Sequence, residues 1–334
     1  MKLFTILRPK SLQLKGMFIL RTTILLILLI FSIHNQASAI QIKKGLQDIK
    51  IVSADKLNYK SDVSILEGNV IIKVKDIYIS SPKVKIYEKK KAEFLESVNV
   101  NSTDLNVIAE KMDIDIVTGL ITIYKANSTI KDYNVESDLQ TLNIDEGIFN
   151  AKANFGKTVT TKYEDIEINS KRLEALFDSK DNDIKDVIQI KFSNNVIATK
   201  NESRINGETL MIFPKEKLYR VIDDAIFFDD KEKLIVEADF MNIEEQSPKD
   251  FVLLASSKSK KNKVKVISQP RKLIAKSRLT RMWIKNEEVE KLVFTGAADV
   301  KLKDRKLVSE EVLLNNSTKE LVSNIERPKA ILLK

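Results

Sequence analysis

Apolar and polar residues alternate along most of the chain. After Gly68-Asn69, the apolar residues Val70, Ile72 and Val74 occupy every second position, and the same period returns around residues 188–192, 264–266 and 300–302. Side chains of a β-strand point alternately to opposite faces, so this period predicts strands with one buried and one hydrated face. No helical period is sustained after residue 45, although segments 170–177 and 304–314 are compatible with a short helical turn.

A four-residue pattern recurs along the chain: an aliphatic residue, any residue, a small residue, and then usually an acid or lysine. Nine copies start 27 to 37 residues apart and read VSAD (52–55), ISSP (79–82), VIAE (107–110), VESD (135–138), INSK (168–171), INGE (205–208), VEAD (236–239), LIAK (273–276) and LVSE (307–310). Apolar residues follow most copies at fixed positions, but the LIAK copy breaks this register. A degenerate repeat of this length indicates a fold built from similar, stacked units.

A second element precedes several copies of the repeat. It reads LEGNV at 66–70, FSNNV at 192–196 and FTGAADV at 294–300. Because Gly and Asn tolerate a positive φ, this element predicts tight hairpin turns that open into strands. Short strands with one apolar face must close over a shared core, so the expected fold is all-β: a jelly roll, a curled double sheet or a β-solenoid.

The first 39 residues have the pattern of an export signal. Five basic residues and no acidic residue precede an apolar run at 24–33, and Ala37-Ser38-Ala39 follows it. A positive flank, a short apolar core and an A-x-A exit predict a secretory signal peptide over residues 1–39, with either Met1 or Met17 as the start. The apolar run is about half of the ~20 residues that a membrane-spanning helix needs, which favours cleavage after Ala39.

The remaining chain offers little material for catalysis. Loss of the leader lowers the formal net charge from +9 to +4, so no nucleic-acid partner is expected. The chain has no Cys, and its single His, His34, lies in the leader. The usual thiol nucleophile, general base and zinc ligands are therefore missing, and no P-loop, G-x-S-x-G or S-x-x-K string is present. We expect no enzyme activity, no cofactor and no metal.

The segment 51–91, IVSADKLNYKSDVSILEGNVIIKVKDIYISSPKVKIYEKKK, resembles the OstA-like (LptA) family of periplasmic lipopolysaccharide-transport proteins. The signature of that family is an A-D strand, a short spacer, a G-N-V turn and strand, and a second A-D strand. Ala54-Asp55 and Gly68-Asn69-Val70 match it, whereas Ser81-Pro82 stands in place of the second A-D. Looser copies occur at 236–239 and 295–300.

The resemblance implies an elongated, twisted β-jelly roll of many short antiparallel strands and a role in lipopolysaccharide transport and outer-membrane assembly in the periplasm. The mature chain is longer than a minimal bridge protein of that family. It therefore suggests either one longer roll or two fused units, 40–180 and 181–334, divided at the polar segment DSKDND (178–183).

In such a roll the apolar face would line a groove for the acyl chains of lipid A, where each buried methylene contributes about 0.8 kcal/mol. The predicted groove residues are Val70, Ile72, Val74, Ile77, Ile79, Val84, Ile86, Val196, Leu210, Ile212, Val300 and Leu302. The same residues could instead form a closed core. The edge strands expected at 49–54 and 330–333 would pair with other lipopolysaccharide-transport components at the inner and outer membranes, or with further copies head to tail.

Two other classes of protein fit parts of the pattern. A non-enzymatic β-solenoid surface or adhesive protein would favour regular coils, against which the uneven spacing of the repeat argues. A carbohydrate-active enzyme using carboxylates would need acids clustered on one face of the sheet, and the repeat does not produce such a cluster.

Overall fold

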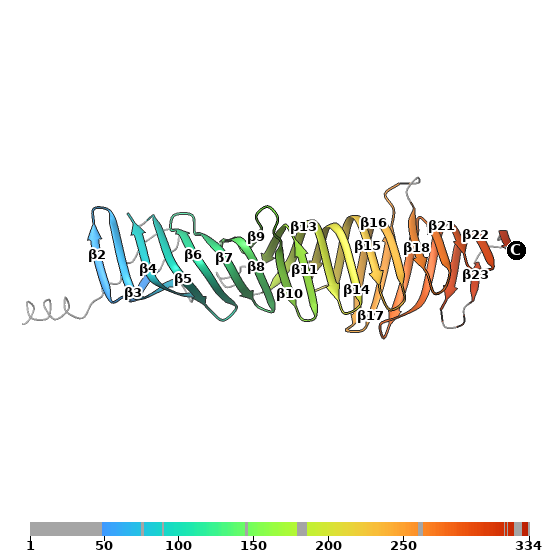
Figure 1. Ribbon diagram of the computed structural model, residues 1–334, viewed down its shortest axis with the longest axis horizontal. Helices are drawn as coiled ribbons and strands as arrows, with labels where there is room; N and C mark the ends of the chain where they lie inside the picture. The colour runs from blue at the N-terminus through green and yellow to red at the C-terminus, as the bar shows by residue number, and fades with distance from the viewer. Residues whose placement is uncertain are drawn as a thin grey trace, which may run out of the picture.

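The computed structural model describes residues 49–74, 77–88, 90–143, 146–178, 186–259, 263–316, 318, 320–323 and 329–332 of the 334-residue chain. These residues form 24 strands of one antiparallel sheet, folded into an elongated roll whose strands lie across the long axis (Figure 1). Within these ranges there is no helix, and so none that is long and apolar enough to cross a membrane. The predicted all-β roll of antiparallel strands is confirmed. The signal peptide predicted at 1–39 lies outside the described residues.

Long strands and pairs of short strands make up the sheet. The long strands have 11 to 14 residues: β3 (Val63–Val74), β4 (Ile77–Tyr87), β5 (Lys91–Asn101), β6 (Leu105–Asp115), β7 (Leu120–Ile130), β8 (Tyr133–Asn143), β13 (Val187–Lys200), β14 (Ser203–Phe213), β15 (Leu218–Asp229), β16 (Leu234–Ser247), β21 (Glu288–Lys301) and β22 (Arg305–Asn315). The short strands follow one another in pairs: β1 (Ile49–Ser53) with β2 (Lys56–Lys60), β9 (Ile148–Lys152) with β10 (Val159–Tyr163), β11 (Ile166–Ser170) with β12 (Arg172–Phe177), β17 (Asp250–Ser256) with β18 (Val264–Ser268), β19 (Leu273–Ser277) with β20 (Leu279–Lys285), and β23 (Leu321–Ser323) with β24 (Lys329–Leu332). Each short pair takes the place of one long strand.

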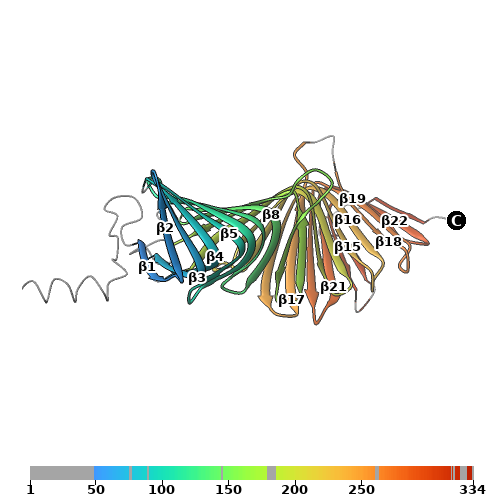
Figure 2. The same cartoon turned by 60° about the vertical axis from the view of Figure 1, so that its left-hand side comes forward.

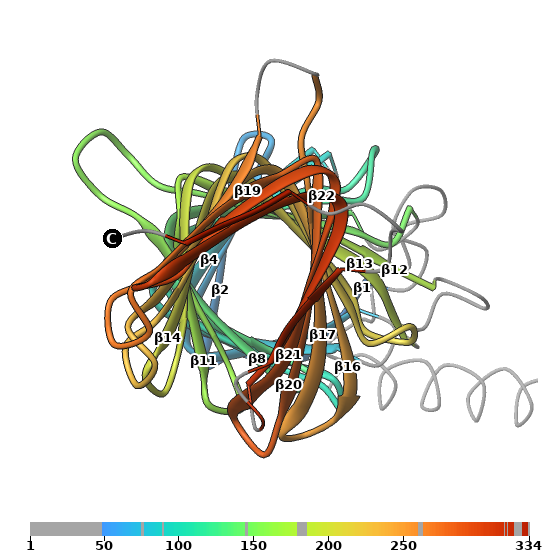
Figure 3. The ribbon, with the colours of Figure 1, turned by 90° about the vertical axis from the view of Figure 1, so that its right-hand side faces the viewer.

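The strands build two facing walls, which a view along the axis shows as the sides of a flattened roll (Figure 3). Each odd-numbered long strand runs from wall B to wall A, and the next, even-numbered strand returns. Wall A contains the second halves of the odd long strands and the first halves of the even ones, and wall B contains the remaining halves. The short strands β1, β10, β11, β18, β19 and β24 belong to wall A. The short strands β2, β9, β12, β17, β20 and β23 belong to wall B. We call the edge where strands pass between walls the corner. The opposite edge, where hairpin tips of the two walls face each other, is the mouth.

The odd long strands bend at the corner through residues of positive φ. These are Gly68 and Asn69 in β3, Glu96 and Ser97 in β5, Lys125 in β7, Asn194 and Asn195 in β13, Asp223 and Asp224 in β15, and Gly296 and Ala297 in β21. In β3, Glu67 pairs with Lys83 and Val70 with Ser81, so Gly68 and Asn69 together face a single residue of β4. Such a bulge bends the strand and increases its twist. The segments LEGNV, FSNNV and FTGAADV are therefore bends within strands, and their prediction as hairpin turns was wrong. The prediction failed because residues that tolerate a positive φ are suited to a hairpin turn and to a bulge within a strand alike.

The four-residue repeat marks the other side of the corner, on the returning strands. Its third, small residue lies where the chain enters wall B, and space there is short: a Cβ on Gly207 would lie 2.5 Å from Cγ1 of Val221. In the eighth copy the corner residue is Ser277, two positions after the alanine of LIAK. The next N–H, that of Arg278, donates to the carbonyls of Thr295 and Gly296, as the N–H of Asp55 does to those of Glu67 and Gly68. This shift explains the broken register of that copy.

Polar side chains of the repeat satisfy backbone groups that the bend leaves without a ladder partner. Asp138 accepts a hydrogen bond from the N–H of Asn154 at 2.9 Å, and Glu310 accepts one from the N–H of Ala297 at 3.2 Å. In three copies the small residue is a serine whose hydroxyl donates to the carbonyl two residues ahead: Ser81, Ser137 and Ser170. Backbone N–H and C=O groups are obligatory hydrogen-bonding groups, so the repeat follows from the hydrogen bonding of the corner.

The inward residues of both walls form one apolar core along the roll. In β6, Leu105, Val107, Ala109, Met112 and Ile114 are buried, while residues between them are exposed or half-buried. The predicted alternation of buried and hydrated positions is thus confirmed.

The sheet is continuous from one end to the other, with strands that change inclination steadily as the roll twists (Figure 2). β12 pairs with β13 on either side of the segment predicted to divide two units, so the ladder crosses it. Residues 179–185 of that segment lie outside the described residues, and the division at 180 stays a prediction. β1 and β24 fall where the first and last strands were predicted.

Gly68 provides a test of the corner. Its φ is +71°, and an added Cβ would lie 2.4 Å from Oδ2 of Asp55, whereas at Gly156, with φ +82°, an added Cβ would meet nothing within 4 Å. Gly68→Ala should lower the free energy of unfolding by about 2–4 kcal/mol, because a backbone penalty and a steric overlap add. Gly156→Ala should lower it by about 1 kcal/mol, from the backbone penalty alone. Denaturant unfolding of both variants measures the difference, and equal losses would contradict a crowded corner.

Candidate functional site

The predicted groove residues face the inside of the roll from both walls. Eleven of the twelve are buried in the core, and Leu302, at the tip after β21, is half-buried against it. Val84, Ile86, Leu210 and Ile212 belong to wall B, and the others to wall A. Their shared inward direction follows from strand alternation.

Over most of the roll these residues pack against the facing wall and do not line an open groove. Val70, Val84 and Val300 have no exposed surface. Between Val135 of wall A and Phe149 of wall B, the remaining space is about 10 Å³, at the lower limit for one water molecule. Packing of this kind is that of an ordinary protein core.

The walls part near the middle of the chain and leave a chamber of about 480 Å³. Its apolar lining consists of Ile166, Ile168, Ala198, Ile205 and Phe227 from wall A, and Leu210, Tyr219, Ile243, Phe251, Leu253 and Ile284 from wall B. The volume lies within the range of pockets that bind small molecules, and an apolar space of this kind does not hold water well. Leu210 is the one predicted groove residue in this lining.

Polar side chains from the hairpin tips form the rim of the chamber at the mouth. Wall A contributes Lys200, Asn201, Glu202, Ser203, Asp229 and Lys231, and wall B contributes Glu287. Nζ of Lys231 lies 3.1 Å from Oε1 of Glu288 across the mouth, and this hydrogen bond raises the pKa of Lys231. Nζ of Lys200 lies 5.6 Å from the ring centre of Phe251, also across the mouth.

Tyrosines close the side of the chamber that faces the first half of the roll. Tyr133 and Tyr163 of wall A stack with ring centres 4.5 Å apart, and Tyr219 of wall B lies close enough to Tyr133 to add to the rise that burial causes in the pKa of Tyr133. Burial raises the pKa of Tyr219, and the charge of Glu245 raises it further. The cluster therefore stays neutral and packed at ordinary pH.

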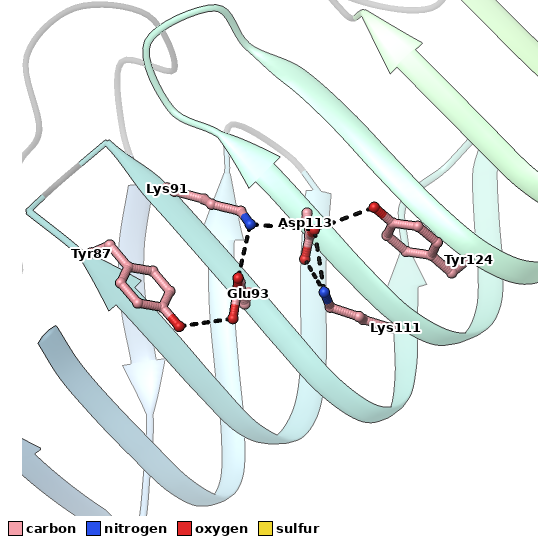
Figure 4. A network of polar contacts seen from close by, with 6 residues as sticks. All are labelled: Tyr87, Lys91, Glu93, Lys111, Asp113 and Tyr124. Carbon is pink, nitrogen blue, oxygen red and sulfur yellow. Dashed lines mark hydrogen bonds and ion pairs between the residues drawn. The ribbon is translucent and has the colours of Figure 1, made fainter.

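Charged residues also gather on the outer face of wall B, across β4 to β7 (Figure 4). Glu93 accepts hydrogen bonds from Lys91 at 2.8 Å and from Tyr87 at 2.9 Å, and Asp113 pairs with Lys111 at 3.1 Å. Burial would raise the pKa of Glu93, but the hydrogen bonds from Lys91 and Tyr87 outweigh it and lower the pKa. A general acid needs a raised pKa, so this network suits cross-strand stabilisation better than proton transfer.

Comparison with known proteins adds no identity: no family model and no curated protein matches this chain. Within the described ranges, no three His, Cys, Asp or Glu side chains lie together as a metal site.

Sequence reasoning placed the inward residues correctly but missed the chamber. Alternation identifies Ile168, Ala198 and Leu253 as inward-facing, as it does dozens of others. The distance between the walls at each level depends on side chains from strands far apart in sequence, and no local signal reports it.

Two alanines of wall A test whether the chamber is open space. Ala198 lines it, whereas Ala275 is equally inward-facing, 1% exposed, and part of the closely packed core away from the chamber. Ala198→Leu should change the free energy of unfolding by less than about 0.5 kcal/mol, because the larger side chain has room. Ala275→Leu should cost about 1–3 kcal/mol through overpacking. Denaturant unfolding compares the two, and an equal cost at both positions would mean that the chamber is not open.

Proposed function

We propose that this protein is a lipid-carrying bridge of the periplasm that moves the acyl chains of lipopolysaccharide through the interior of its roll during outer-membrane assembly. The observation that carries the proposal is an apolar chamber of about 480 Å³ within a roll whose inward face is apolar along its length. The resemblance of residues 51–91 to the OstA-like family supports it independently and suggests lipid A as the cargo.

The interior offers an acyl chain an environment that water does not. Each methylene removed from water contributes about 0.8 kcal/mol. The inward residues are mostly aliphatic, so they would hold a chain without a polar group that fixes it in place. Since the walls are in contact on both sides of the chamber, passage along the roll requires them to separate at the mouth while the corner keeps them joined.

The ends of the roll suit docking to further β-structure. β1 and β2 pair with β3, and β23 and β24 pair with β22, which leaves one edge of each free among the described residues. Free strand edges add strands from other proteins. The proposed partners are transport components at the inner and outer membranes, or further copies joined head to tail.

A carrier of this kind needs no covalent chemistry. The chain has no Cys, and its only His is His34, in the leader. The proposal therefore includes no enzyme activity, no cofactor and no metal, and it places the mature protein, beginning at Ile40, in the periplasm.

Neighbouring positions of β3 test the transport proposal. Ile72 is inward-facing and 1% exposed, while Lys73 points to the other face of the same strand. A photo-crosslinking residue at position 72 should trap lipopolysaccharide in cells, and the same residue at position 73 should not. The two positions are adjacent in the strand, but their side chains point to opposite faces of the sheet.

The pair of positions controls for expression and for nearness to the membrane. Equal labelling at 72 and 73, or no labelling at 72 and at chamber positions such as Leu210, would mean that the interior is a closed core and that the transport proposal is wrong.

A further inference from the structure

The chamber is closed along the axis of the roll in both directions. Toward the first half, Tyr219 at its lining is followed by the stacked pair Tyr163 and Tyr133, and then by the interior where about 10 Å³ remains. Toward the second half, Met282 and Leu292 of wall B have no exposed surface. A ligand that reached the chamber from either end would have to displace packed core.

The mouth presents a shorter route. The rim side chains Asn201, Glu202, Lys231 and Glu287 are exposed, and they stand directly outside the apolar lining. This order, apolar inside and polar with both charge signs at the rim, suits an amphiphile whose aliphatic chain enters while its polar head stays in water.

Among the described residues, two polar side-chain contacts join the walls across the mouth at the chamber. The ion pair Lys231–Glu288 and the cation–π contact of Lys200 with Phe251 each join wall A to wall B. The other ion pairs of the described residues join groups within one wall or at the corner. Examples are Lys215–Asp186 in wall B and Lys258–Asp223 at the corner.

The contact between Lys231 and Glu288 is of a kind that opens readily. Its side chains are 48% and 66% exposed, and exposed ion pairs contribute little to stability. Separation of these tips leaves the hydrogen-bond ladders of both walls intact, because the ladders run along each wall and join at the corner.

We propose that the mouth between Lys231 and Glu288 is a lateral port, through which one aliphatic chain of an amphiphile enters the chamber from the side of the roll. This inference rests on the proposed lipid-carrying function and adds a point of entry to it. The port allows loading at mid-length with no passage past the tyrosine cluster.

Bridging the port with a reagent tests the inference. The chain contains no Cys, so Lys231→Cys combined with Glu288→Cys introduces the only two thiols. A bis-maleimide with a cleavable linker joins them in the folded, full-length protein. Uptake of the fluorescent fatty acid cis-parinaric acid, followed by stopped flow, should become at least about tenfold slower in the bridged form. Cleavage of the linker should restore the rate.

A second pair of tips provides the control. Lys215→Cys with Asp186→Cys replaces an ion pair of the same length, 3.1 Å, that lies within wall B. Bridging it should leave the rate of uptake unchanged. Equal rates for bridged and open Lys231→Cys/Glu288→Cys protein would overturn the lateral port alone. No uptake by the unaltered protein would contradict the lipid-carrying function as well.

Discussion

The structure depends on keeping the backbone hydrogen bonds of a single sheet intact while every long strand, or pair of short strands, turns from one wall to the other. A sheet edge or an interrupted ladder exposes unpaired N–H and C=O groups, and these are costly where water is excluded. The chain meets this constraint with positive-φ residues on one strand and a small residue followed by a polar one on the next. Asp55 and Gly68 illustrate the pairing: the carboxylate lies where a side chain on Gly68 would be, and the N–H of Asp55 donates to the carbonyl of Gly68.

This arrangement divides the molecule into a rigid and an adjustable edge. The corner is held by backbone hydrogen bonds, close packing and side-chain caps. At the chamber the mouth is held by an exposed ion pair and a cation–π contact, both from side chains at hairpin tips. A roll built this way can change the distance between its walls without breaking its ladders. A ligand that enters and leaves requires this property, and a rigid closed core lacks it.

The chain has no disulfide to support this shape. Its stability comes from the apolar core between the walls and from strand pairing that continues through all 24 strands. On the outer face of wall B, opposite charges on neighbouring strands pair with each other, as in the network of Glu93 and Asp113. Such cross-strand pairs add to the stability of the sheet and keep this face polar. The interior can therefore be strongly apolar while the outside stays hydrated.

The sequence by itself determined the fold class, the direction of the inward side chains and the positions of the corner. Alternation of period two is set by strand geometry, so Ile72 and Lys73 could be assigned to opposite faces from the sequence alone. The repeat with Ala54-Asp55 and Gly68-Asn69 was visible because the corner imposes the same local conformation at each level. Its meaning was misread, since Gly and Asn favour a positive φ in a hairpin and in a bulge alike. Only the tertiary structure decided that these residues bend strands, that the walls separate around Ala198 and Leu253, and that Lys231 meets Glu288. These features depend on side chains that are far apart in sequence, and their spacing is set by packing between the walls, which no local pattern encodes.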